Sequence, residues 1–208
     1  MAYTNGSIFT LHGHTFRVEI EHDQHAEAPW VQNDCHGPVR EVRTNHTGYT
    51  SKRPGERLLE RAFSYRASHG YAYDWAEAMR TARRDGWGIP QAEIEAWTQR
   101  SGRAPTPGLI AQAAVQRDFD YLRRWLTDDW HYVGVIVRLL DDEGDSIDES
   151  SLWGIESDAR DYIDEVAREN AEDILYRLKL DPKSVATEAA ETAYWAARGV
   201  ITTINAGA

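Results

Sequence analysis

The 208-residue sequence has a single cysteine, Cys35, and this scarcity excludes an intrachain disulfide framework. No apolar run approaches the ~20 residues that a membrane-spanning helix requires. The first ten residues, MAYTNGSIFT, lack the basic start and apolar stretch of a secretory signal peptide. These absences predict a soluble protein of a reducing cytoplasm, with no membrane partner.

The local signatures of common catalytic sites are absent as well. The sequence contains no G-x-S-x-G nucleophile elbow, no P-loop and no G-x-G-x-x-G dinucleotide motif. Gly86 and Gly88 have G-x-G spacing, but the pattern places them after a helix rather than a strand. A lone cysteine outside a catalytic signature is usually inert. We therefore expect no catalytic residue and no cofactor, and a binding protein is favoured over an enzyme.

Histidine is a metal-ligating residue type that gathers near the N-terminus. Eight are present, and four lie in FTLHGHTFRVEIEHDQH, residues 9–25. A metal site needs several imidazole or thiolate ligands that converge on one ion. His12 and His14 would point the same way on one strand, but Gly13 between them indicates a turn. We expect no metal site, and the alternative is a metal-dependent hydrolase or nuclease built from His12, His14, Asp34 and His36.

Periodicity predicts an α+β fold, in which an antiparallel sheet carries several helices and the C-terminal half is acidic. HYVGVIVRLL, residues 131–140, is the most strand-like run and is expected at the centre of the sheet. Further strands are predicted over 5–11, 14–23 and 147–154. Helices are predicted over 75–85, 90–100, 107–127, 157–180 and 183–198, with capping signals at Asp74, Gly86 and Thr106.

These elements suggest a single domain over residues 1–180 with a long irregular loop near 26–56. Residues 181–208 form a C-terminal helix and tail that pack on the domain or on a second copy, which would make a homodimer. Gly134 is expected to let Trp125 or Trp153 approach the central strand. The inner face of the 157–180 helix should carry Ile163, Val166, Asn170, Ile174 and Leu178. The expected core comprises Val133, Val135, Val137, Phe119, Leu122, Trp153, Ile163 and Val166.

Charge is distributed unevenly along the chain, whose net charge is -11. Residues 1–108 hold 13 basic and 13 acidic residues, whereas residues 109–208 hold 10 basic and 21 acidic ones. A surface that carries this excess of negative charge repels nucleic acid and favours a positively charged partner. The simpler interpretation is a solvated face that keeps the protein soluble. The candidate partner-binding residues lie in one turn and on one helix: Asp141, Asp142, Glu143, Asp145, Asp148, Glu149, Asp161, Glu165, Glu169 and Asp173.

Four blocks of the sequence are similar to small bacteriophage-encoded accessory proteins of unknown function. They are PWVQNDCHGPV, RRDGWG, DWHYVGVIVRLLDDEGD and SLWGIESDARDYIDEVARENAEDI. Cys35 departs from the resemblance, which would place a small residue such as glycine there, and this argues against thiol chemistry. The resemblance covers about the first 180 residues and implies an accessory protein of the bacterial host cytoplasm.

Accessory phage proteins often block host machinery, and this class-level analogy sets the functional expectation. Dense negative charge resembles the phosphates that nucleic-acid-binding clefts neutralise. The expected function is therefore non-enzymatic inhibition of a bacterial nucleic-acid-handling or defence complex, of the anti-CRISPR or anti-restriction type. The partner is a host protein or a protein–nucleic-acid complex.

Overall fold

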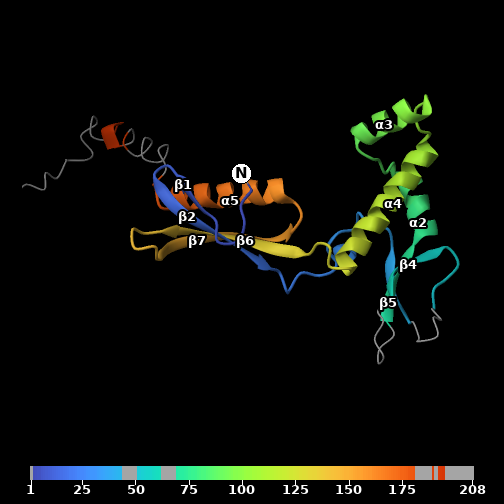
Figure 1. The fold of residues 1–208 in the computed structure, drawn as a ribbon, viewed down its shortest axis with the longest axis horizontal. Coiled ribbons are helices and arrows are strands. Elements are labelled where there is room, and N and C mark those ends of the chain that lie inside the picture. The colour runs from blue at the N-terminus through green and yellow to red at the C-terminus, as the bar shows by residue number, and fades with distance from the viewer. Residues whose placement is uncertain (1, 44–50, 62–68, 181–188, 190–191, 195–208) are drawn as a thin grey trace, which may run out of the picture. The chain divides into compact units, whose positions relative to one another are not determined.

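The computed structural model describes residues 2–43, 51–61, 69–180, 189 and 192–194 (Figure 1). These residues form antiparallel sheets and helices, which confirms the predicted α+β fold. The chain divides into two compact units instead of the single domain expected over residues 1–180. The terminal unit is Met1–Gln24 with His131–Ala208, and the inserted unit is His25–Trp130. The division arises because the inserted residues build a sheet and a hydrophobic core of their own.

The terminal unit contains a four-stranded antiparallel sheet in the order β1-β2-β6-β7. The sheet confirms the predicted strands and places β6 internally. Every β6 residue except Arg138 is buried. His12 and Gly13 form the two-residue turn between β1 and β2, both with positive φ, as the sequence predicted. The strand bounds are β1 Ile8–Leu11, β2 His14–His22, β6 Tyr132–Leu140 and β7 Ser146–Glu156.

Helix α5, Arg160–Arg177, packs against β6 and β7 on one face of this sheet (Figure 1). It begins after the predicted Ser157 or Asp158, with Ala159 as the N-cap residue. Asn170 lies on the inner face as predicted, and its side chain donates to the Val135 carbonyl oxygen at 3.2 Å. The buried face comprises Ile163, Val166, Ala167, Ala171, Ile174 and Leu175.

Leu178 was wrongly assigned to this inner face. Leu178 is 40% exposed because the helix ends one residue before it, at Arg177. Leu175 is buried in the core instead. Trp153 was also wrongly assigned to the core, since it is 45% exposed. Its ring nevertheless lies against Gly134, where an added Cβ would come within 2.4 Å of Trp153 Cε3. The predicted close approach at Gly134 is therefore confirmed, with Trp153 as the neighbour.

β7 is an edge strand of the sheet. Side chains of the same unit form hydrogen bonds with some of its backbone groups. The Glu149 N–H donates to Asp148 Oδ1 at 2.8 Å. The Glu149 carbonyl oxygen accepts a 3.0 Å hydrogen bond from Arg177 Nη2 on α5. Both backbone groups of Glu149 are thus satisfied by neighbouring side chains.

The described residues of the inserted unit form a three-stranded antiparallel sheet in the order β3-β5-β4 and four helices. The predicted caps of two helices are confirmed: Asp74 accepts from the Glu77 N–H at 2.9 Å, and Thr106 accepts from the Leu109 N–H. The expected loop 26–56 contains a short helix and a strand. The bounds are α1 Pro29–Gln32, β3 Val39–Arg43, β4 Glu56–Arg61, β5 His69–Asp74, α2 Trp75–Asp85, α3 Gln91–Ser101 and α4 Pro107–Leu126.

The core of the inserted unit lies where α2 and α4 meet the sheet. Phe119 and Leu122, both predicted core residues, are buried here rather than beside β6. Leu59 and Tyr73 supply the sheet side of the core. The remaining predicted core residues, apart from Trp153, lie in the terminal unit: Val133, Val135, Val137, Ile163 and Val166.

Glu56 is a buried charged residue at the start of β4, and only 5% of it is exposed. Arg40 holds both carboxylate oxygens, through Nε at 2.6 Å and Nη2 at 2.8 Å. The Arg53 N–H donates to the same carboxylate. The hydrogen bond from Arg40 is the main cause that lowers the pKa of Glu56 below its ordinary range, against the opposing effect of burial.

The predicted C-terminal helix, residues 183–198, falls mostly outside the described residues. Residues 189 and 192–194 are helical. The suggestion that this segment packs on a second copy stays a prediction.

We predict that Gly134→Ala destabilises the terminal unit by about 1–2 kcal/mol, because the added Cβ displaces the Trp153 ring. Urea unfolding followed by tryptophan fluorescence measures the loss. Gly88→Ala is the matched control, since a Cβ there meets no atom within 4 Å. Equal stability of the two variants would contradict the packing described.

We predict that Glu56→Gln lowers the free energy of unfolding at pH 7 by about 1–2 kcal/mol. Because the folded-state pKa of Glu56 is lowered, its contribution is present above the unfolded pKa, about 4.3, and is lost as pH falls through the folded pKa. The variant should therefore lose less stability than wild type on acidification below about pH 5. Urea unfolding across pH 3–7 checks this. Glu41→Gln, at an exposed carboxylate on β3, should retain the wild-type profile.

Candidate functional site

The turn between β6 and β7 presents the first group of predicted binding residues. Asp141 is used inside the turn: its carboxylate accepts from the Asp145 N–H at 2.8 Å, and its own N–H donates to the Asp145 carbonyl oxygen. Arg17 on β2 donates to the Gly144 carbonyl oxygen at 3.0 Å and so anchors the turn to the sheet. The side chains of Asp142, Glu143 and Asp145 are left exposed at the tip.

Three predicted residues form ion pairs with arginines of their own unit. Arg177 lies 3.2 Å from Asp148 and 3.0 Å from Asp173, so it joins β7 to α5. Arg138 on β6 lies 2.6 Å from Glu149. Because these carboxylates already have a cationic neighbour, their availability to a partner is reduced.

The outward face of α5 carries the remaining predicted residues, and we call this set the acidic ridge: Asp161, Glu165 and Glu169. All three are exposed, and none makes an ion pair within the described chain. They are four residues apart, which places successive carboxylates about 6 Å apart along the helix axis. Glu172 extends the same exposed face, although it is not one of the candidate partner-binding residues.

Charge divides between the two units more sharply than between the two halves of the sequence. The terminal unit holds 8 basic and 20 acidic residues, a net charge of -12. The inserted unit holds 15 basic and 14 acidic residues, a net charge of +1. The N-terminal strands therefore belong to the acidic unit, and the whole excess of negative charge lies in it.

A polar cluster that the sequence did not predict lies in the inserted unit, around Asp118 of α4. One carboxylate oxygen, Oδ1, lies 2.6 Å from His36 Nδ1. The other, Oδ2, accepts from the Gly37 N–H at 2.8 Å and from the Tyr73 hydroxyl at 2.6 Å. The His36 ring stacks on Tyr121 with 5.4 Å between centroids. No local motif marks this cluster, because Asp118 is 82 residues from His36 in sequence.

The Asp118 cluster could serve either proton transfer by His36 or the attachment of residues 36–37 to α4. A histidine whose Nδ1 is fixed by a carboxylate keeps Nε2 for proton transfer, as general bases do. The described residues place no hydroxyl, thiol or amine in hydrogen-bonding contact with that nitrogen. Burial, followed by the hydrogen bond to Asp118, raises the pKa of Tyr73 far above its ordinary value, so the hydroxyl stays a donor. The contacts shown are those of a clamp between residues 36–37 and α4.

The residues of the alternative metal site are divided between the two units. His12 and His14 belong to the β1–β2 hairpin, whereas Asp34 and His36 precede β3. In the described part of the chain, no three His, Cys, Asp or Glu side chains gather in a way that would hold a metal ion. Cys35 is exposed.

No helix among the described residues is long and apolar enough to cross a membrane. Comparisons of this chain with known proteins matched no family model, no curated protein and no solved structure.

We predict that Asp118→Ala destabilises the inserted unit by about 2–4 kcal/mol, because the buried Tyr73 hydroxyl and the Gly37 N–H lose their acceptor. Chemical unfolding followed by circular dichroism measures the effect. Asp120→Ala on the same helix removes an exposed carboxylate and should change stability by less than about 0.5 kcal/mol. The clamp interpretation fails if both variants unfold at the wild-type urea concentration.

Proposed function

We propose that this protein is a phage accessory protein that binds and inhibits a nucleic-acid-handling or defence complex in the cytoplasm of a bacterial host. The binding surface consists of the acidic ridge and the tip of the β6–β7 turn. The observation that carries the proposal is the concentration of the net charge in one unit, -12 against +1.

The distribution of ion pairs within the terminal unit supports a binding role for the ridge. Asp148, Glu149 and Asp173 form ion pairs with Arg138 or Arg177. Asp161, Glu165 and Glu169 remain exposed without an ion pair in the described chain. Like charges four residues apart cost a few tenths of a kcal/mol per pair, so stability alone does not favour this row.

The physical consequence of such a surface is a long-range negative potential. It accelerates association with a positively charged cleft and excludes nucleic acid from the same cleft. Direct binding of DNA or RNA by the ridge is opposed by repulsion between carboxylates and phosphates. The interaction weakens as salt screens the charges, with a Debye length of about 8 Å at physiological ionic strength.

The test compares two triple variants that change the net charge equally. Asp142→Lys, Glu165→Lys and Glu169→Lys reverse the proposed surface. Glu27→Lys, Asp34→Lys and Glu95→Lys reverse three exposed acids of the inserted unit. Tagged wild-type protein and both variants are used to recover partners from a bacterial lysate at rising salt, with and without added duplex DNA.

We expect the first triple variant to retain about tenfold less partner than wild type, since three attractive charges become repulsive. The second variant should retain the wild-type amount. Rising salt and added DNA should both displace the partner. Equal retention by the two variants, or retention that is indifferent to salt, would contradict the proposal. Circular dichroism establishes that both variants are folded.

A further inference from the structure

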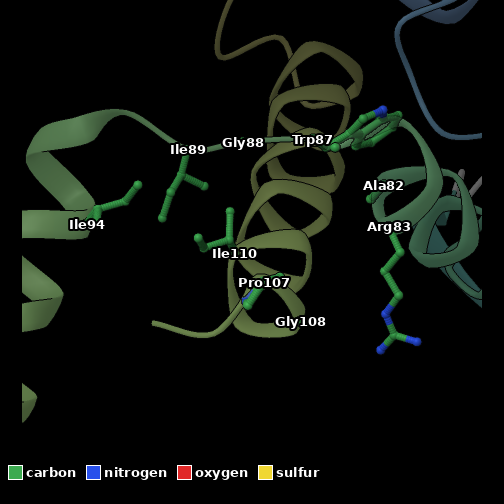
Figure 2. Close-up of a pocket in the computed structure, with 10 residues that line it drawn as sticks. Ala82, Arg83, Trp87, Gly88, Ile89, Ile94, Pro107, Gly108 and Ile110 are labelled. Carbon is green, nitrogen blue, oxygen red and sulfur yellow. The ribbon is translucent and has the colours of Figure 1, made fainter. Parts of the chain in front are cut away.

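The inserted unit contains an open cavity of about 560 Å³ that plays no part in the acidic surface. It lies between the end of α2, the loop that follows α2, and the first turns of α3 and α4 (Figure 2). This volume falls within the range of pockets that bind small molecules, about 300–1,000 Å³. The lining is mainly apolar, with Ile89, Ile94, Ile110 and Trp87 as its larger apolar side chains.

The cavity is open because α3 packs loosely. None of the residues of α3 is buried, and Ile94 on this helix is only half-buried. An ion pair between Glu93 and Arg117 links α3 to α4. A Cβ added at Gly88 would meet no atom within 4 Å, so this wall also faces open space. Ile89, Ile94 and Ile110, from the loop, α3 and α4, point toward one another along the open cavity (Figure 2).

Arg83 is the charged residue of the lining. It is exposed, and its guanidinium has no hydrogen bond or ion pair in the described chain. Two neighbouring arginines of α2 differ: Arg80 pairs with Glu77, and Arg84 pairs with Asp85 at 2.7 Å. An apolar cavity with an uncompensated cation at its edge is complementary to an apolar anion.

We propose that this cavity binds a small molecule with an apolar body and one anionic head group. The body packs against the isoleucines of the loop, α3 and α4, and the head group binds Arg83. Burial of apolar surface supplies most of the affinity, and the charge-assisted hydrogen bond selects anions. The site lies in the inserted unit, so it is independent of the proposed acidic surface.

Two fluorescent probes with the same ring system test the proposal. 1-Anilinonaphthalene-8-sulfonate carries an anionic group, and N-phenyl-1-naphthylamine lacks it. We expect both to bind the full chain saturably at one equivalent. Arg83→Gln should weaken the sulfonate about fivefold to tenfold, which is the scale of one charge-assisted contact near the surface. It should change binding of the uncharged probe less than about twofold.

Two further variants fix the place of binding. Ile94→Ser removes an apolar wall on a helix without core residues, and it should weaken both probes about tenfold while circular dichroism stays unchanged. Arg84→Gln, at the paired neighbour, should leave both affinities unchanged. The proposal is overturned if neither probe saturates at one equivalent, if Arg83→Gln and Arg84→Gln act alike, or if Ile94→Ser leaves both affinities at the wild-type level.

Discussion

The antiparallel pairing of β2 with β6 is the contact on which the terminal unit depends. It joins strands that are more than a hundred residues apart, in a register that runs from Thr15 opposite Leu140 to His22 opposite Val133. The Asp23 N–H donates to the Tyr132 carbonyl oxygen at 2.8 Å, which extends the pairing of the two strands beyond His22. The two ends of the inserted unit therefore leave this sheet beside each other. Because these ends are adjacent, the inserted unit acts as a long connection between β2 and β6. The entropic cost of closing such a connection grows only slowly with its length.

Within the inserted unit, a single carboxylate performs the corresponding long-range role. Asp118 satisfies a backbone N–H, a buried tyrosine hydroxyl and a histidine ring at once. Gly37 is required beside it, because a Cβ there would lie 2.3 Å from the Tyr73 hydroxyl oxygen. The segment before β3, which looked irregular in the sequence, thus has polar contacts that fix it to α4.

The sequence predicted those features that depend on neighbours along the chain. The buried strand over residues 132–140, the turn at His12 and Gly13, and the caps at Asp74 and Thr106 all follow from local patterns. The place of Gly134 beneath Trp153 was also foreseeable, because glycine interrupts an otherwise bulky strand. The predictions from sequence were wrong where contacts between distant residues determine the burial of a side chain. Trp153 is 45% exposed even though its ring lies against Gly134.

The same limit applies to the candidate sites. The acidic positions were visible as a run of charge, but only the fold shows that Arg177 pairs with both Asp148 and Asp173. The Asp118 cluster required residues from α4, β5 and a loop to meet, and no spacing rule connects them. The cavity near Arg83 depends on how loosely α3 packs, which its amphipathic pattern does not reveal.

The arrangement at Glu149 has a consequence for the behaviour of the protein at high concentration. An open strand edge is a template on which a strand of another molecule adds, and repeated addition produces fibres. At Glu149 both backbone groups are already taken, by the Asp148 carboxylate and the Arg177 guanidinium. A strand arriving from another copy finds the N–H already bonded and the carbonyl oxygen already shared with Arg177, and its own carboxylates are repelled by those of β7. Growth of ordered aggregates along β7 is therefore opposed at the middle of the strand.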